Sequence, residues 1–407
     1  MKKIALITSG YMPVPASLGG AVECLDDYLI NQNETEQRCN IDVFSCYEAE
    51  AEKIAAALRS TSVKFIKTPV ILKLGDLIIY NIIRILRPHS QTMSYRYILK
   101  RLYFISKVAK ILHVENYDEV MLENHATLLM IMKKYKNHKK YKGRFIYHLH
   151  NEQNNLYGCE DVLKDAKFVA TVSEYISKCI RSKVPELKDS QIKIWKNCVD
   201  STKFGSDSAK LKAEQLKIKY NIPKDKILIL FTGRLSPEKG IRELLMAFKD
   251  CHNNNLHLII AGGYFSGNDK IKNVYEEELK RLTMSIKDKI TFTGFVDYKE
   301  VPALYMMSDI VIVPSTWNDP APLTVIEAIT SGKPLITTES GGIPEYANKN
   351  CAILLARNNC LVDELTNAIE ELASDENKRN KMSIAALNTS KSWSIPQYYK
   401  TFVEMID

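Results

Sequence analysis

Two acidic residues, Asp319 and Glu327, lie eight positions apart in the stretch DPAPLTVIEAITSG, residues 319–332. Pro322 suits the first turn of a helix, where a missing N–H costs nothing. Glu327 then falls just over one turn into an otherwise apolar helix, where a carboxylate is costly unless it accepts hydrogen bonds. Ribose hydroxyls are natural donors to it, and the helix N-terminus offers amides to a phosphate or sugar oxygen. The two acids can thus grip opposite ends of a nucleotide-sugar; the alternative is a capping Asp with a solvent-facing Glu.

Two cations follow another apolar run, in the segment GRLSPEKG at residues 233–240. Arg234 is a planar cation and Lys239 a point cation, five residues apart across a turn. Such a pair can hold a diphosphate, with helix amides as additional donors. A surface loop that carries two charges is the alternative for this segment.

A third group of polar residues ends two apolar runs in the first half of the chain. His148 and His150 close the run RFIYHLH, and Asn124 and His125 follow the run DEVMLE. A histidine at the carboxyl end of a strand can contact a sugar or act as an acid or base. A buried core histidine is the commoner outcome for either ring.

The elements that must position these residues form a repeating pattern of short β-branched runs and helical segments. Near-continuous apolar runs separated by helices predict parallel sheets that are buried on both faces, and two such series predict two doubly wound α/β domains. The first series comprises residues 3–9, 41–46, 62–67, 118–123, 144–150, 167–173 and 191–196, and the second comprises 226–233, 256–263, 289–294, 309–315, 334–338 and 352–355.

The joint between the two series is expected in the Gly/Ser/Asp-rich stretch at residues 197–208. In open α/β sheets, ligands bind at the carboxyl ends of the strands. If the two domains face each other, the polar segments of both converge on one cleft, which is a default ligand site.

Composition narrows the class of protein further. The 407 residues carry a net charge of +8. The nine cysteines are scattered and form no C-x-x-C pair, so neither a disulfide framework nor a structural zinc site is expected, and a reducing compartment is the expected location. The apolar start of the chain is too short for a signal peptide, and no run reaches the length of a membrane span.

The positive charge excess lies in the first half of the chain. The stretch 80–112 mixes Arg and Lys with apolar and aromatic residues at helical spacing. A basic amphipathic helix of this kind suits an anionic membrane surface, and a solvated helix with an ordinary core face is the alternative. No nucleic-acid module is recognised, so nucleic acid is not an expected partner.

Taken together, these motifs resemble the family 4 retaining glycosyltransferases of the GT-B fold, over nearly the whole chain. The resemblance rests on Gly19-Gly20, the strand-end His150, VSE at 172–174, NCVD at 197–200, the Arg234 and Lys239-Gly240 clamp, GFV at 294–296, SDIVIVPS at 308–315, the acid pair Asp319 and Glu327, and the terminal Trp-Ser with its helix. Several motifs in the same order are far more specific than any one of them.

The resemblance implies a GT-B fold with two Rossmann-like domains. Residues 1–198 would bind the acceptor, residues 199–392 would bind the nucleotide-sugar, and the helix at 393–407 would pack back on the first domain. The implied activity is a retaining, metal-independent transfer from a nucleotide-sugar, most simply a UDP-sugar, to a glycan or lipid-linked acceptor of bacterial surface polysaccharide. The implied location is cytoplasmic, at the inner face of the membrane, and no cofactor is implied.

The resemblance also implies residue roles. The catalytic group would be His150, Asp319, Arg234 and Lys239. The nucleotide-sugar would be bound by Gly20, Arg234, Lys239, Gly294, Phe295, Val296, Asp319, Ala321, Pro322, Leu323 and Glu327. Gly19, Asn124, His125 and His148 would face the acceptor. No Asp-x-Asp ends a strand, so the two cations would neutralise the leaving diphosphate in place of a metal.

Three departures from the family pattern concern the donor sugar. Asp319 replaces the usual first Glu, residues 321–323 replace the common Phe-Gly pair, and Cys198 replaces the linker Gly. Two rival functions stay open: a nucleotide-sugar epimerase of the same fold, and a non-catalytic partner of a polysaccharide synthase complex. A dinucleotide oxidoreductase is disfavoured, because no G-x-G-x-x-G follows the first strand of either domain.

Overall fold

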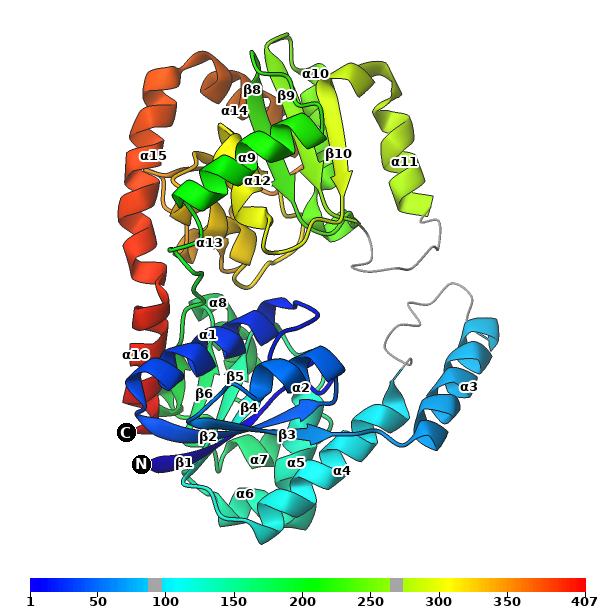
Figure 1. The fold of residues 1–407 in the computed structure, drawn as a ribbon, viewed down its shortest axis with the longest axis vertical. Helices are drawn as coiled ribbons and strands as arrows, with labels where there is room; N and C mark the ends of the chain where they lie inside the picture. The colour runs from blue at the N-terminus through cyan, green and yellow to red at the C-terminus, as the bar shows by residue number, and fades with distance from the viewer. Residues whose placement is uncertain (87–96, 264–273) are drawn as a thin grey trace. The chain divides into compact units, whose positions relative to one another are not determined.

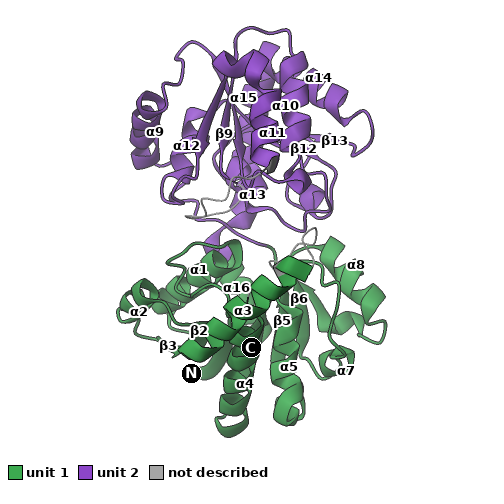
Figure 2. Ribbon diagram, turned by 90° about the vertical axis from the view of Figure 1, so that its right-hand side faces the viewer, with its two compact units in different colours: residues 1–196, 398–407 green, residues 197–397 purple. Residues whose placement is uncertain are grey.

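The structure is a computed structural model that describes residues 1–86, 97–263 and 274–407. The chain divides into two compact units, which Figure 2 colours separately. Unit 1 comprises residues 1–196 and 398–407, and unit 2 comprises residues 197–397.

Unit 1 is built on a parallel sheet of seven strands in the order β3-β2-β1-β4-β5-β6-β7 (Figure 1). Its strands are β1 (Lys2–Ile7), β2 (Cys39–Cys46), β3 (Thr61–Ile66), β4 (Glu119–Glu123), β5 (Phe145–Leu149), β6 (Phe168–Thr171) and β7 (Ile192–Ile194). Every residue of β4 and β5 is buried, so helices cover both faces of the sheet there.

The helices of unit 1 connect successive strands. They are α1 (Ala21–Glu36), α2 (Ala49–Ala55), α3 (Val70–Leu86), α4 (Ile98–Val114), α5 (Leu129–Lys133), α6 (Asn137–Lys140), α7 (Glu160–Leu163) and α8 (Glu174–Lys183). The final helix α16 (Ile395–Ile406) completes this unit: the Tyr398 ring stacks on Trp195 with centroids 4.5 Å apart, and the Tyr399 hydroxyl donates to Asn33 Oδ1 at 2.7 Å.

Unit 2 has a parallel sheet of six strands in the order β10-β9-β8-β11-β12-β13. Its strands are β8 (Ile227–Thr232), β9 (Leu256–Ala261), β10 (Ile290–Gly294), β11 (Ile310–Val313), β12 (Leu335–Thr338) and β13 (Ala352–Leu355), and its helices are α9 (Asp207–Lys219), α10 (Ile241–Asp250), α11 (Val274–Leu282), α12 (Val301–Met307), α13 (Leu323–Thr330), α14 (Leu361–Ser374) and α15 (Glu376–Ser390). Both sheets confirm the predicted pair of doubly wound α/β folds, because each predicted strand is present within a few residues of its expected bounds.

The described part of the basic stretch at 80–112 falls in two helices, α3 and α4. The whole stretch comprises the end of α3, residues 87–96, which lie outside the described residues, and most of α4. The apolar face of α4 is packed in the core through Phe104, Ile105 and Val108. This agrees with the alternative prediction for that stretch, a solvated helix with an ordinary core face. In the described part of the chain, no helix is both long enough and apolar enough to cross a bilayer.

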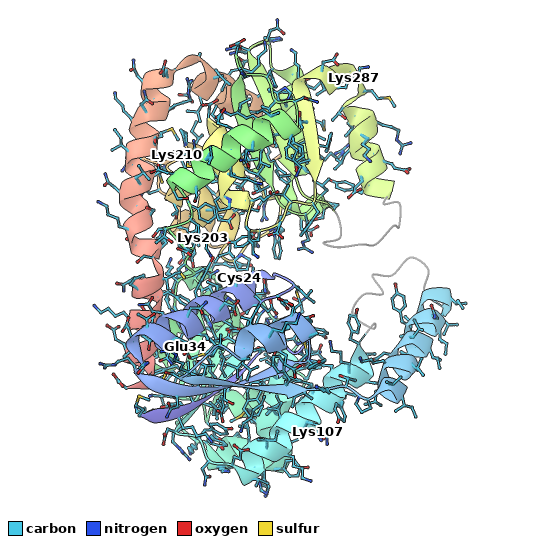
Figure 3. All side chains as sticks on the ribbon, in the orientation of Figure 1. Cys24, Glu34, Lys107, Lys203, Lys210 and Lys287 are labelled. Atoms are coloured by element: carbon cyan, nitrogen blue, oxygen red, sulfur yellow. The ribbon has the colours of Figure 1, made fainter. Side chains whose placement is uncertain are left out.

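The cysteines are single thiols, as their scatter along the sequence indicates. All nine are free, and burial raises the pKa of several of them, including the Cys39 thiol to about 12. Side chains point to every side of both sheets, and Figure 3 labels exposed lysines such as Lys107 on α4 and Lys210 on α9.

Candidate active site

The site residues predicted from the sequence form two groups, one at the carboxyl edge of each parallel sheet. In unit 2, Arg234 follows β8, Gly294 ends β10, and Asp319 follows β11. Because parallel strands end at a common edge, and loops leave the sheet there, these side chains gather at one side of unit 2.

Lys239 and Asp319 are brought together directly. The Lys239 Nζ atom donates to Asp319 Oδ2 at 2.6 Å, although 80 residues separate them in sequence. Gly240 permits this approach: its φ is +70°, and a Cβ atom there would lie 1.8 Å from the carbonyl oxygen of Pro314. The glycine therefore lets the start of α10 pack against the segment after β11, which carries Asp319.

Glu327 is buried rather than solvent-facing, so the alternative reading of this residue is wrong. Its Oε1 atom accepts a hydrogen bond from the Tyr298 hydroxyl at 3.0 Å, and its Oε2 atom accepts one from the Tyr305 hydroxyl at 2.8 Å. Burial raises the pKa of Glu327, and the two hydroxyls oppose that shift. Each carboxylate oxygen keeps a lone pair for a further donor.

The helix α13 begins shortly after Asp319. Pro322 is its N-cap residue instead of the first helical position, and no side chain caps the helix. The helical amides begin at Leu323, and the carbonyl of Ala321 accepts from Asn197 Nδ2 at 3.1 Å, which fixes the turn before the helix.

A cavity of about 180 Å³ opens beside Arg234 in unit 2. Its walls come from the ends of β8 and β9, the segment after β10 and the helix α12, with Ala261, Phe295, Val296, Val301 and Leu304 as the apolar side chains. The backbone of Gly262 lines it, and a Cβ there would lie 1.9 Å from the carbonyl oxygen of Gly233. A flat ring can enter between these walls because glycine backbone, without side chains, forms part of them.

In unit 1, His150 belongs to a buried cluster with Glu123 and His148. Glu123 Oε2 lies 3.0 Å from His150 Nε2 and 3.1 Å from His148 Nδ1, and the two ring nitrogens are 3.1 Å apart. Glu123 and His148 are register partners on β4 and β5, which explains their contact. The His148 ring also stacks on Trp195 with centroids 4.2 Å apart.

The environment of this cluster sets its protonation. Burial, and next the charge of His148, lower the pKa of His150 to about 4. Burial alone would raise the pKa of Glu123, but His148 and His150 hold it at about 2. The three donor atoms lie close enough to hold a divalent metal ion, and they also satisfy one another as a hydrogen-bonded set.

The remaining predicted residues of unit 1 shape the loops around this cluster: Gly19, Asn124 and His125 from the acceptor group, and Gly20 from the nucleotide-sugar group. Asn124 has φ +63°, and its Oδ1 atom accepts from the backbone N–H of His150 at 3.2 Å. Gly20 caps α1 with φ +107°, where a Cβ would lie 2.3 Å from Glu23 Oε2, and Gly19 precedes it with φ +75°. Burial, followed by the charge of Arg101, lowers the pKa of His125 to about 4.

The sequence motifs do not include Arg101, which the structure places at this edge of unit 1. Its Nε atom donates to Thr127 Oγ1 at 2.8 Å, and its guanidinium lies 4.4 Å from the Tyr11 ring centroid. Within the described residues its Nη1 and Nη2 atoms are buried without a hydrogen-bond partner. An arginine on the apolar side of the helix at 98–114 is a signal that could have revealed it.

The architecture is that of GT-B proteins, two Rossmann-like units with polar residues at the carboxyl edges of both sheets. The HepE protein of Anabaena, solved in complex with UDP, superposes with a TM-score of 0.71 at 19% identity, over 100% of this chain and 99% of that one. At this identity the likeness concerns the fold.

Sequence comparisons identify the class of enzyme. The model described as "Glycosyl transferases group 1" matches residues 212–389. YtcC of Bacillus subtilis, which is named as a glycosyltransferase, is 26% identical over 391 residues, 94% of this chain and 86% of that protein. A lipopolysaccharide 1,2-N-acetylglucosaminetransferase of Salmonella typhimurium is 29% identical over 135 residues, 33% of this chain and 35% of that protein. The match to the group 1 glycosyltransferases, the GT4 family, thus covers most of unit 2, and the similarity to a protein named as a glycosyltransferase covers nearly the whole chain. Together they identify the chain as a nucleotide-sugar-dependent glycosyltransferase of class EC 2.4.

Proposed function

We propose that the protein transfers a sugar from a UDP-sugar to a glycan or lipid-linked acceptor of bacterial surface polysaccharide, with retained anomeric configuration and without a metal ion. The observation that carries the donor assignment is the grouping at one edge of unit 2. The Lys239–Asp319 pair, the Glu327 carboxylate and the cavity beside Arg234 supply the three kinds of contact that a nucleotide-sugar needs.

The donor roles follow from these contacts. The base stacks in the cavity against Phe295 and Val296, next to Gly294. Glu327, oriented by two tyrosine hydroxyls, accepts hydrogen bonds from the ribose. Arg234 and Lys239 hold the diphosphate, and Asp319 with the amides after it holds the sugar hydroxyls. UDP as the nucleotide is supported by the HepE structure, which was solved in complex with UDP.

Catalysis in this proposal is electrostatic. The bond to the leaving diphosphate breaks as negative charge develops on the diphosphate oxygen. Arg234 and Lys239, which are in position before the reaction, stabilise that charge. Lys239, which holds the diphosphate, also donates through Nζ to Asp319 Oδ2 at 2.6 Å, and Asp319 holds the sugar. The diphosphate and the sugar are therefore bound by two side chains that contact each other. The acceptor attacks from the face of departure without a protein nucleophile, and positioning supplies much of the rate.

His150 contacts the sugar near its reacting carbon in this proposal. Its low pKa keeps the ring neutral near pH 7, so it serves as a hydrogen-bonding group and not as a cation. Glu123 and His148 fix the ring through the contacts at 3.0 and 3.1 Å. His148 is fully buried under Trp195, which makes it a positioning residue instead of an acceptor contact.

The setting is proposed from the relatives and from the charge of unit 1. Similarity to a lipopolysaccharide transferase supports a surface-polysaccharide acceptor, and the basic surface of unit 1 supports an enzyme that works in the cytoplasm at the inner face of the membrane. Sedimentation with anionic vesicles at low salt tests this location: binding that falls as salt rises is expected, and no binding at low salt contradicts it.

Product analysis tests the reaction class. We expect free UDP and a transferred sugar whose anomeric configuration, read by NMR coupling constants, matches that of the donor. An isomerised nucleotide-sugar without free UDP would identify an epimerase instead. Tight UDP binding without turnover on any acceptor of a surface-glycan library would favour the non-catalytic partner, to which the Asp319 and 321–323 departures give some support.

A further inference from the structure

A second, larger cavity of about 840 Å³ lies within unit 1. It opens at the carboxyl ends of β2 and β3, where Cys46 and Ile66 are the last strand residues, and it is bounded by α3 and the start of α4. Its volume falls within the range of small-molecule sites, and the carboxyl edge is where parallel sheets bind ligands. None of the residues predicted from the sequence to form the site lines it.

One wall of this cavity is apolar and continues onto an exposed helix face. Val70, Leu74 and Leu77 of α3 line the cavity with the rings of Tyr80 and Tyr97. The large apolar residues of α3 that are exposed by half or more are Val70, Ile71, Leu74, Leu77, Ile78, Ile82, Ile85 and Leu86. Soluble proteins rarely leave so many neighbouring aliphatic side chains in water without a partner for them.

The cavity also has a positively charged side, which three lysines provide. Lys67, Lys73 and Lys100 line the same cavity, and Lys67 also forms an exposed ion pair with Glu52 Oε1 at 3.7 Å. Among the described residues that line it, Asp76 is the one acid, and it is already engaged, because its two carboxylate oxygens accept the backbone N–H groups of Leu99 and Lys100 at 2.7 and 2.9 Å. The cavity therefore combines a hydrocarbon wall with a surplus of ammonium groups.

The cavity is connected to the proposed acceptor side by direct contacts. The Lys100 Nζ atom donates to the carbonyl oxygen of Tyr11 at 3.3 Å, and the Tyr11 ring lies 5.6 Å from the His125 ring. His125 follows β4, at the same sheet edge as His150. A ligand anchored in the cavity would thus extend toward the histidine cluster along one edge of unit 1.

We propose that this cavity binds the lipid phosphate of the acceptor: the hydrocarbon chain lies against α3, and the phosphate lies between Lys67, Lys73 and Lys100. The inference rests on the proposed function, since it names the class of acceptor. Charge complementarity selects an anion, and the continuous apolar wall selects an amphiphile over a free sugar phosphate. A membrane surface alone would use the outer face of α3 and would leave the lysine-lined cavity without a role.

Binding of farnesyl phosphate to the full-length protein, at concentrations below micelle formation, tests the proposal by isothermal titration. Farnesol and inorganic phosphate are the two comparison probes. We expect saturable binding with one site, and at least tenfold weaker binding for each comparison probe. Lys73→Met and Leu77→Ser should each weaken farnesyl phosphate at least tenfold, whereas Leu211→Ser, a matched exposed leucine on α9, should leave it unchanged.

Two results would overturn the inference. One is the absence of saturable farnesyl phosphate binding. The other is farnesyl phosphate binding that neither Lys73→Met nor Leu77→Ser changes. This holds also if Leu77→Ser lowers sedimentation with anionic vesicles, because α3 would then contact a membrane surface and not a lipid phosphate in the cavity. UDP binding is titrated on the same samples: retained UDP binding with no lipid phosphate binding rejects this inference alone, and lost UDP binding with intact lipid phosphate binding rejects the donor assignment alone.

Discussion

Removal of the Glu327 carboxylate should weaken UDP binding about a hundredfold or more. Each carboxylate oxygen already accepts one tyrosine hydroxyl, at 3.0 Å from Tyr298 and 2.8 Å from Tyr305, so the group is fixed before the ligand arrives. Hydrogen bonds to charged groups contribute about 1.5–3 kcal/mol each, so the loss of two ribose contacts costs at least about 3 kcal/mol, or roughly two powers of ten in Kd. Isothermal titration of UDP against wild type, Glu327→Gln and Glu327→Ala measures this directly.

The control ligand is pyrophosphate, which has no ribose and should bind wild type and both variants equally. Folding of the variants is checked by urea unfolding. The free energy of unfolding should fall only modestly, because the Tyr305 hydroxyl keeps Thr232 Oγ1 as a partner at 2.9 Å. Tyr298→Phe, which removes one orienting hydrogen bond, should weaken UDP by about tenfold or less. UDP affinity within threefold of wild type in both Glu327 variants would refute the assignment, as would an equal loss of pyrophosphate binding.

Three further predictions concern the two sheet edges. Gly262→Ala should destabilise unit 2 by about 1–3 kcal/mol in urea unfolding, because its Cβ would lie 1.9 Å from the carbonyl oxygen of Gly233; unchanged stability would contradict that close approach. Asp319→Asn should lower sugar transfer while UDP binding holds or tightens, since Lys239 loses its carboxylate partner; weaker UDP binding would contradict the shared-lysine account. The pKa of His150 is about 4 in the folded protein and about 6.5 in the unfolded chain, so the unfolded chain binds more protons between these pH values. The free energy of unfolding should therefore fall as the pH drops from about 6.5 to 4, by at most about 1.4 kcal/mol per pH unit from this residue. His150→Gln should flatten that slope in urea titrations at several pH values, and an unchanged slope would reject the buried neutral histidine.

Much of the fold is readable from the chain, because parallel strands buried on both faces leave continuous β-branched runs. The run at 226–233 is β8 and the run at 256–263 is β9, each with a glycine just past its end. The polar residues after these runs are found for the same reason, since the carboxyl edge of a sheet follows once the strands are known.

The partners of the site residues are not readable in this way. Tyr298 and Tyr305 reach Glu327 from a loop and from α12, and no periodicity links them to α13. The Lys239–Asp319 contact depends on the packing of α10 against the segment after β11. The sequence analysis also placed the amphipathic surface in residues 80–112, whereas the exposed apolar face extends along α3, residues 70–86, and overlaps that stretch only at 80–86. Tertiary packing and not periodicity decides which helix face is covered.

The most direct test of the donor site is nucleotide release from UDP-, GDP- and dTDP-sugars, with and without EDTA, on wild type, Lys239→Ala and the exposed control Lys210→Ala. We predict that wild type and Lys210→Ala release UDP from a UDP-sugar at equal rates that EDTA leaves unchanged, and that Lys239→Ala releases it at least a hundredfold more slowly. UDP release that EDTA abolishes, or that Lys239→Ala retains in full, would contradict a metal-independent transferase whose diphosphate lies at Lys239.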